Sequence, residues 1–219
     1  MERVLESEVM DDPAQARAYA DADFHEENQG FVDLFLRYFP DVIQGHLLDL
    51  GCGPADIAIR LARALASCRV TGIDASRPMI EIGREAVHQA GLEDRITLRC
   101  ERVQTLTLSE PADVVISNSL LHHLKNPLNF WHVVRHLVTP GGYVLVMDLI
   151  RPESHEAAQA IVDRYAAGES PILRRDFYNS LCAAFTEDEV AAQLAEMNLS
   201  GVLIDVLDDR HWVAGGRVY

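Results

Sequence analysis

The sequence predicts one α/β domain built around a mostly parallel sheet. Three observations predict it: short apolar runs alternate with amphipathic segments of helical spacing, two of these runs end in an acid, and a glycine-rich turn follows the first run. The chain has 219 residues, 48% of them hydrophobic, which is enough for a substantial core. The sequence has no repeats, low-complexity tracts or linkers, so we expect a single domain over 1–219.

The N-terminal residues, 1–44, are expected to form a helical cap. Aromatic residues and leucines recur at steps of three and four between 31 and 39, which gives one apolar face to a helical stretch over about 13–39. Pro40 ends this stretch because proline disrupts the hydrogen bonding of a helix interior.

An apolar run and a glycine turn follow the cap. The run over 46–50 predicts a buried strand, and Asp49 stands near its end. Gly51 and Gly53 then allow a tight turn, at which a ligand can approach bare backbone, before a helix expected over 55–66.

A second strand, expected over 69–74, ends in Asp74. An acid at this point can accept both hydroxyl groups of a ribose. Ser76 is suited to cap the next helix, and Pro78 to its first turn, so a helix is expected over 78–90. Further strands are expected over 95–100, 112–117 and 143–149, and a further helix over 127–138.

Two nucleotide-binding motifs compete at the glycine turn. The dinucleotide fingerprint G-x-G-x-x-G would place its third glycine at Asp56, whose size and charge disfavour an NAD-linked oxidoreductase. The other motif is the D-x-G-x-G-x-G pattern of class I S-adenosylmethionine-dependent methyltransferases. Asp49, Gly51 and Gly53 match it, and Ala55 stands where the last glycine usually is.

The following part of the chain resembles the same family. Residues 112–124 resemble its fourth motif and residues 140–146 the turn into its fifth strand, so that five motifs stand in order over about 45–150. The resemblance implies a Rossmann-like, doubly wound seven-stranded sheet, mostly parallel with an antiparallel last strand, with N-terminal helices and a helical insert after strand 5. Residues 45–150 are then the cofactor-binding core, and 151–185 are an insert that covers the substrate.

The C-terminal region, 186–219, is expected to hold one helix and a hairpin at one edge of the sheet. Thr186 and Glu189 fit a capping box that opens a helix over 187–198. The remaining expected elements are two insert helices, over 154–167 and 172–185, and two final strands, over 201–207 and 212–218.

The resemblance implies S-adenosylmethionine as the cofactor and S-adenosylhomocysteine as its product. Asp49 and the glycine turn would surround the methionine moiety, Asp74 would hold the ribose, and Met79 and Glu101 would contact the adenine. The full expected cofactor-binding set is Asp49, Gly51, Cys52, Gly53, Asp74, Ala75, Met79, Glu101, Arg102, Asn118 and Ser119. Within it, Cys52 is interpreted as a small residue that fits the turn rather than as a reactive thiol.

Methyl transfer from a sulfonium is an in-line displacement that mainly requires alignment and exclusion of water. A base helps when the acceptor is a hydroxyl or a protonated amine. His122 and His123 end the fourth motif; we expect only one of them, His123, to face the pocket, the alternative being a packing or capping role. Asp148 and Tyr19 complete the catalytic candidates, although Asp148 could equally pair with Arg151.

The net charge of −15 disfavours nucleic acid and anionic membranes as partners, because both require clustered cations. We therefore expect a small-molecule acceptor, and a monomer or homodimer. No apolar run reaches the length of a membrane span, and four scattered cysteines without a C-x-x-C motif predict reduced thiols in a cytoplasmic protein. No metal is expected: His132 and His136 have ligand spacing, but Val133 stands where a metalloprotease motif has its acid.

Two other functions remain open for the same fold. The cofactor pocket could support non-methyl chemistry, although aminopropyl transferases carry paired aspartates where this chain has Ser117 and Asn118. The chain could also be a non-catalytic binding partner, which the presence of Asp49, Asp74 and Glu101 disfavours. The sequence does not identify the acceptor or the methylated atom.

Overall fold

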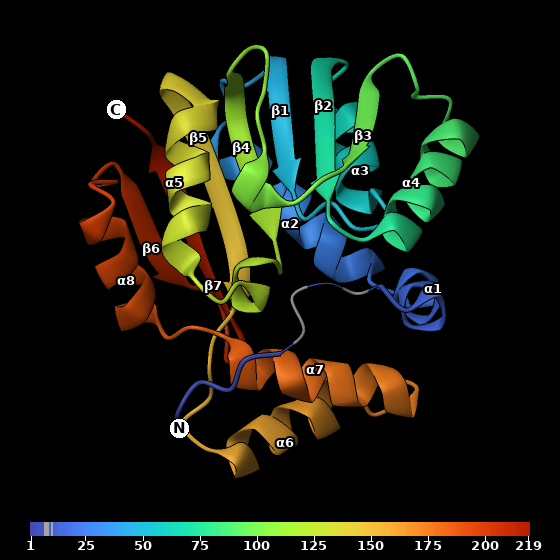
Figure 1. The fold of residues 1–219 in the computed structure, drawn as a ribbon, viewed down its shortest axis with the longest axis vertical. Helices are drawn as coiled ribbons and strands as arrows, with labels where there is room; N and C mark the ends of the chain where they lie inside the picture. Colours follow the sequence, from blue (N-terminus) through green and yellow to red (C-terminus); the bar gives the residue numbers. More distant parts are fainter. Residues whose placement is uncertain (7–8, 10) are drawn as a thin grey trace.

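The described residues form one seven-stranded sheet in the order β3-β2-β1-β4-β5-β7-β6 (Figure 1). The structure is a computed structural model that describes residues 1–6, 9 and 11–219, so the part of the expected cap at Ser7, Glu8 and Met10 lies outside the described residues. The strands are β1 (Gln44–Leu50), β2 (Ser67–Asp74), β3 (Ile96–Cys100), β4 (Ala112–Asn118), β5 (Val138–Leu149), β6 (Val202–Val206) and β7 (His211–Arg217). Every strand expected from the sequence forms, and β5 begins at Val138 rather than at 143.

The pairing of the strands confirms the predicted sheet. β1 pairs in parallel with β2 and β4, and β3 and β5 extend the parallel part on either side. β7 runs antiparallel to β5, and β6 antiparallel to β7, which makes the expected hairpin at one edge. The strand order reverses between β1 and β4, and in open sheets of this kind ligands bind outside the carboxyl ends of the strands at that point.

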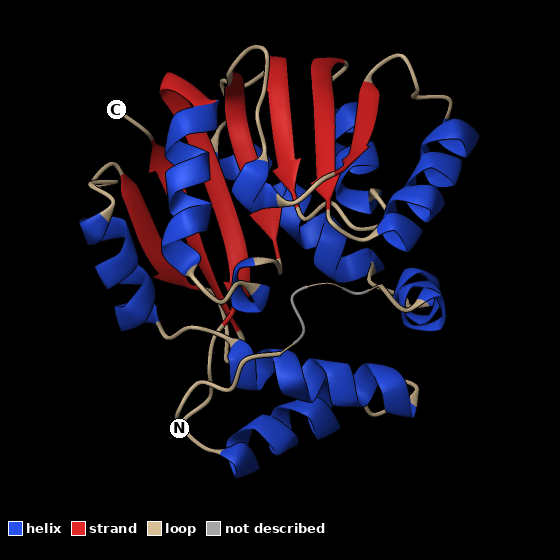
Figure 2. Ribbon diagram, viewed as in Figure 1, coloured by secondary structure: helices blue, strands red, loops and turns tan. Residues whose placement is uncertain are grey.

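Helices cover both faces of the sheet (Figure 2). α2 (His25–Tyr38), α3 (Asp56–Ala64) and α4 (Arg77–Ala90) share an apolar core with one face, and α5 (Pro127–Leu137) and α8 (Glu187–Glu196) share a second core with the other. The two insert helices, α6 (His155–Tyr165) and α7 (Pro171–Ala183), pack on each other beyond the carboxyl ends of the strands (Figure 1). None of the helices in the described part of the chain is long and apolar enough to cross a membrane.

The helical stretch expected over 13–39 is divided into two helices, α1 (Pro13–Asp21) and α2. The carboxylate of Asp23 accepts a hydrogen bond of 3.1 Å from the backbone N–H of His25. This side chain therefore offers the backbone an alternative to a continuous helix, and α2 starts after it. The division lets α1 turn away from the sheet and pack against α4 and α7.

The first residues of the chain run along α7 to the short helical turn η2 (Leu121–His123). The backbone N–H of Val4 donates to the carbonyl of Cys182 at 2.9 Å. The Arg3 guanidinium donates through Nη2 to the carbonyls of His122 and Leu124, at 2.8 and 3.0 Å. These contacts fix the N-terminal segment, residues 1–6, between the insert and the turn after β4, which the sequence does not predict.

Candidate functional site

A cavity of about 560 Å³ lies at the carboxyl ends of β1, β2 and β4. Its wall on the sheet side includes Gly51, Gly53, Asp74, Asn118 and Ser119, and α1, α7 and the N-terminal segment supply the opposite side. The volume is in the usual range for small-molecule sites, and the position is the topological switch point of the sheet.

The glycine turn forms because two backbone donors share one carbonyl. The N–H groups of Gly51 and Cys52 donate to the carbonyl of Ile73 at 2.8 and 3.0 Å. Gly51 has φ of 77°, and a Cβ there would lie 2.9 Å from Cβ of Leu120, so a larger residue is excluded on two grounds. The turn thus presents bare backbone to the cavity.

Cys52 lies in the turn without lining the cavity. Its sulfur packs against β2, where a Cβ added to Gly72 would come within 2.9 Å of it. Burial raises the pKa of the Cys52 thiol well above its ordinary value, with smaller contributions from Asp49 and Asp74. The side chain is therefore a protonated packing group.

Asp74, at the end of β2, lines the cavity. Its Oδ2 accepts from the N–H of Gly53 at 2.9 Å, and its Oδ1 from the N–H of Ser76 at 2.8 Å. Burial raises the pKa of Asp74, and these two hydrogen bonds oppose the rise. The hydroxyl of Ser76 caps α4 through the N–H of Met79, which brings Met79 into the cavity wall beside Ala75.

Asp49 lies behind the turn rather than in the cavity wall. The residue is 2% exposed, and its Oδ2 has no hydrogen-bond partner among the described residues. Burial, and after it the charge of Asp74, raises the pKa of Asp49 to about 7. A buried carboxylate without partners is costly, and a cationic ligand nearby would relieve that cost.

Glu101 follows β3 but does not reach the cavity. Its carboxylate binds the guanidinium of Arg99 in a two-point contact, with N–O distances of 2.8 and 2.9 Å. Arg102 does not line the cavity either; the wall here comes from Val103 and Gln104. The sequence identified this loop but not which of its residues face the ligand, because side-chain direction in an irregular loop has no periodic signal.

Asn118 and Ser119, at the end of β4, both line the cavity. Ser119 has φ of 56°, and its N–H donates to the carbonyl of Met147 at 2.9 Å. Oδ1 of Asn118 is buried and has no hydrogen-bond partner among the residues that the structure describes. The end of β4 therefore offers an acceptor oxygen to a ligand.

Both His122 and His123 line the cavity, so the expectation that only one of them faces it is wrong. The η2 turn is a 3-10 helix, in which neighbouring side chains are about 120° apart, and the cavity extends around both. The side chain of His122 is 3% exposed, whereas that of His123 is 22% exposed. His123 is therefore the more accessible of the two.

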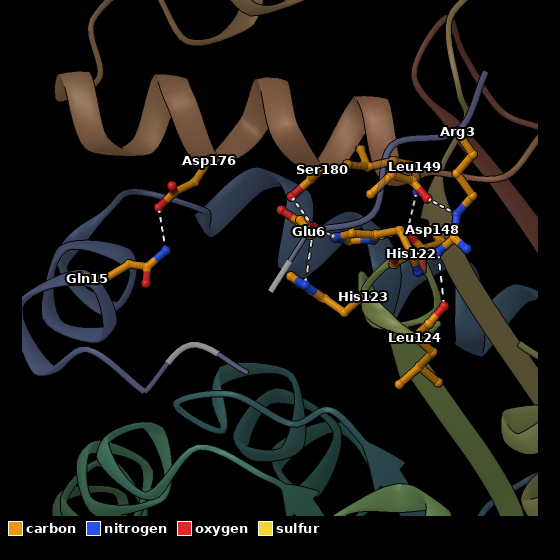
Figure 3. Close-up of polar contacts among 11 residues, drawn as sticks. Arg3, Glu6, Gln15, His122, His123, Leu124, Asp148, Leu149, Asp176 and Ser180 are labelled. Atoms are coloured by element: carbon orange, nitrogen blue, oxygen red, sulfur yellow. Dashed lines mark hydrogen bonds and ion pairs between the residues drawn. The ribbon is translucent and has the colours of Figure 1, made fainter. Parts of the chain in front are cut away.

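Asp148, at the end of β5, is 1% exposed and lies behind His122 (Figure 3). Its Oδ1 is 2.5 Å from Nδ1 of His122, and its Oδ2 accepts the backbone N–H of His122 at 3.2 Å. Burial alone would raise the pKa of Asp148, but the charge and hydrogen bond of His122 outweigh it and lower that pKa. The alternative pairing with Arg151 does not occur, because Arg151 binds Glu189 at 2.7 Å.

The pKa of His122 shifts in the opposite direction, upward. Burial opposes its charged form, but the attraction of Asp148 and, more weakly, of Glu6 raises the pKa of the imidazole above its ordinary value. The lowered pKa of Asp148 and the raised pKa of His122 both describe a buried imidazolium–carboxylate pair.

Glu6, on the N-terminal segment, is a cavity residue that the sequence analysis missed. Its Oε1 accepts a hydrogen bond from the hydroxyl of Ser180 on α7 at 3.0 Å. The same oxygen lies 3.4 Å from Nε2 of His122 and 3.2 Å from Nδ1 of His123 (Figure 3). Burial raises the pKa of Glu6, and the charge of His122 opposes the rise.

Tyr19 enters the cavity from α1, and its ring centroid lies 4.8 Å from that of Phe24. Burial raises the pKa of Tyr19 to about 12, so its hydroxyl keeps its proton and can act as a donor. On the same side, Nε2 of Gln15 donates to Oδ2 of Asp176 at 2.7 Å, which joins α1 to α7 (Figure 3).

Comparison with known proteins supports one family. The sequence matches the family described as "Methyltransferase domain" over residues 47–142. It is 29% identical to 27-O-demethylrifamycin SV methyltransferase of Amycolatopsis mediterranei over 157 residues, which are 70% of this chain and 53% of that protein. It is 30% identical to ubiquinone biosynthesis O-methyltransferase of Methylocella silvestris over 175 residues, 78% of this chain and 66% of that protein.

Solved structures share the fold. The plantazolicin methyltransferase BamL, in complex with a triazolic desmethylPZN analog and SAH, superimposes with a TM-score of 0.71 at 14% identity, covering 92% of this chain and 89% of that one. The chain spans between about half and two thirds of the length of the two curated relatives.

Proposed function

Since the chain belongs to the class I S-adenosylmethionine-dependent methyltransferases, we propose that it transfers the methyl group of S-adenosylmethionine to a small-molecule acceptor. One observation carries the proposal: a single cavity is lined both by the glycine turn with Asp74 and by His122 and His123. When bound, the cofactor would supply a methyl group on a positively charged sulfur and leave as S-adenosylhomocysteine.

Two buried oxygens without partners among the described residues support this cofactor. Oδ2 of Asp49 and Oδ1 of Asn118 lack hydrogen bonds there, and the ammonium group of the methionine moiety has N–H donors to offer. The two acids Asp49 and Asp74 also favour a cationic ligand over a pyrophosphate. We assign Asn118 and Ser119 to the methionine moiety and Asp74 to the ribose hydroxyls. Asp49, behind the turn, would act on the methionine moiety through its charge.

The adenine is assigned to the apolar wall at Met79 and Val103, which both line the cavity. We give no adenine contact to Glu101 or Arg102. Neither lines the cavity, and the carboxylate of Glu101 is already bound by Arg99.

The acceptor is assigned to the end of the cavity at Glu6, His122 and His123, and we propose a hydroxyl oxygen as the atom that is methylated. A hydroxyl loses its proton during transfer, and the partly exposed ring of His123 is the group that can accept it. Asp148 is a positioning residue, because it holds the ring of His122 without lining the cavity. Tyr19 would donate a hydrogen bond to the bound ligands.

Calorimetry of the full chain with S-adenosylmethionine tests the cofactor, together with mass spectrometry of any ligand that co-purifies. We expect binding of S-adenosylmethionine or co-purified S-adenosylhomocysteine. A panel of small alcohols and phenols then tests the acceptor, with release of S-adenosylhomocysteine as the readout. Binding of a nicotinamide dinucleotide, with no heat of binding from millimolar S-adenosylmethionine, would overturn the proposal.

A further inference from the structure

Glu6, His122 and His123 bring potential ligand atoms within 4.8 Å of one another in the cavity wall. Oε1 of Glu6 is 3.4 Å from Nε2 of His122 and 3.2 Å from Nδ1 of His123 (Figure 3). Two atoms bound at about 2.1 Å to one cation, with an angle of about 90–110° between the bonds, lie roughly 3.0–3.4 Å apart. Both distances therefore match edges of a metal coordination sphere.

Asp148 prepares His122 for such a role. Nδ1 of His122 faces Oδ1 of Asp148 at 2.5 Å, so the proton of the neutral ring belongs on Nδ1. A cation bound there would displace the second proton of the imidazolium from Nε2, the nitrogen that faces Glu6, and leave its lone pair free to coordinate. A carboxylate behind a histidine in this way commonly orients the ring at a metal site.

The N-terminal segment is held so that Glu6 stays beside the histidines. Arg3 binds the carbonyls of His122 and Leu124 on the η2 turn, and the hydroxyl of Ser180 binds the Glu6 carboxylate. Glu6 is therefore held by a contact to its own carboxylate and by the anchoring of Arg3, three residues before it.

We propose that Glu6, His122 and His123 form a binding site for a divalent first-row transition-metal cation such as Zn²⁺, Mn²⁺ or Fe²⁺. Two imidazoles and one carboxylate are a ligand set typical of these ions, and the cavity leaves coordination positions open. The two nitrogen ligands disfavour Mg²⁺ and Ca²⁺, which prefer oxygen. The carboxylates of Glu6 and Asp148 supply negative charge close to the cation.

The role of the cation rests on the proposed function, whereas its binding does not. At the acceptor end, a bound cation can coordinate the acceptor oxygen and lower the pKa of its hydroxyl, with the proton passing to solvent. Nδ1 of His123 is then a ligand rather than the group that accepts the proton. The sequence predicts no metal, and it gives no sign of this site because Glu6 shares no motif with the two histidines and only the fold brings them together.

Calorimetric titration of the chelator-treated full chain with Zn²⁺ and with Mg²⁺ tests the site. We expect one site that binds Zn²⁺ and binds Mg²⁺ far more weakly. Glu6→Gln and His123→Gln should each reduce Zn²⁺ affinity at least about tenfold, and Asp148→Asn by about 10- to 100-fold. Thermal unfolding of each variant shows whether it is folded, and the visible spectrum of bound Co²⁺ gives a second readout of the ligand set.

The exposed pair His132 and His136 on α5 provides the matched control, because these histidines stack on each other and do not line the cavity. His132→Gln combined with His136→Gln should leave Zn²⁺ affinity unchanged. Absence of Zn²⁺ binding, equal affinity in folded Glu6→Gln and His123→Gln, or loss of binding in the control would overturn the inference. S-adenosylmethionine affinity, measured on the same samples, reports on the proposed function separately.

Discussion

The backbone N–H of Gly53 donates a hydrogen bond of 2.9 Å to Oδ2 of Asp74, which ties the turn after β1 to the end of β2. Oδ1 of Asp74 accepts from the N–H of Ser76 in the same way, at 2.8 Å. Each carboxylate oxygen has a second lone pair, so Asp74 can shape the cavity and still bind a ligand hydroxyl.

Asp74→Ala should weaken binding of S-adenosylmethionine by about 1.5–3 kcal/mol, since it removes hydrogen bonds to a charged group. Calorimetry measures the affinity directly. Asp113→Ala is the matched control, because Asp113 also accepts a backbone N–H, from His46 at 2.8 Å, but does not line the cavity. Equal affinity in the Asp74 variant and the wild type would remove the ribose assignment.

The stability of the protein should fall as the pH rises from about 4 to 7, through the titration of Asp49. Its pKa is raised from 3.8 to about 7 in the folded state, so in this window the folded chain binds more protons than the unfolded chain. Asp49→Asn removes this titration, and its free energy of unfolding relative to wild type should rise by roughly 2–4 kcal/mol between pH 5 and pH 8.

Denaturant unfolding of both proteins in the absence of ligand, at pH 5 and at pH 8, measures this difference. A difference between them that does not change with pH would contradict the raised pKa of Asp49. The same variant should bind S-adenosylmethionine more weakly than the wild type at pH 8, because it lacks the negative charge.

Gly51→Ala should destabilise the fold more than Gly53→Ala. Both glycines have positive φ, 77° and 50°, which costs alanine about 1–2 kcal/mol. Only at position 51 would the new Cβ also meet a side chain, that of Leu120 at 2.9 Å, whereas at 53 nothing lies within 4 Å. Thermal unfolding of the two variants separates the clash from the backbone strain, and equal losses would show that Leu120 moves aside.

Arg3→Met should loosen the N-terminal segment, because the carbonyls of His122 and Leu124 lose their donor. We expect the free energy of unfolding to fall by about 1–3 kcal/mol. The affinity for S-adenosylmethionine should change little, since the affected part of the cavity is the part proposed to bind the acceptor. The exposed neighbour Glu2, changed to Ala, is the control. A larger effect on cofactor affinity than on stability would argue against this division of the cavity.

Glu101→Gln should leave S-adenosylmethionine affinity within about threefold of wild type, a difference of less than 1 kcal/mol. Its carboxylate is bound by Arg99 and does not line the cavity. Calorimetry measures the S-adenosylmethionine affinity of this variant and of Asp74→Ala under the same conditions. If Glu101→Gln loses as much affinity as Asp74→Ala, then Glu101 contacts the adenine as the sequence resemblance implies, although it does not line the cavity.

The strands, the helices and the glycine turn could be predicted because their causes are local. Apolar periodicity, caps such as Ser76, and glycines at positive φ act within a few neighbouring residues. The same holds for Asp74, whose place at the end of β2 follows from the strand itself. The division of the helix over 13–39 could not be predicted from apolar periodicity. It depends on one hydrogen bond from a backbone N–H to the Asp23 side chain, which leaves the spacing of apolar residues unchanged.

The sequence by itself determined the order of the elements and the place of the glycine turn, since contiguous residues carry the information for both. Tertiary structure alone decided that Glu6 meets His122 and His123, that Asp148 pairs with His122 rather than with Arg151, and that Glu101 turns to Arg99. These contacts depend on which distant segments become buried together. A buried polar group that lacks a hydrogen-bond partner is costly, so each of these side chains pairs with the polar group that the packing places next to it.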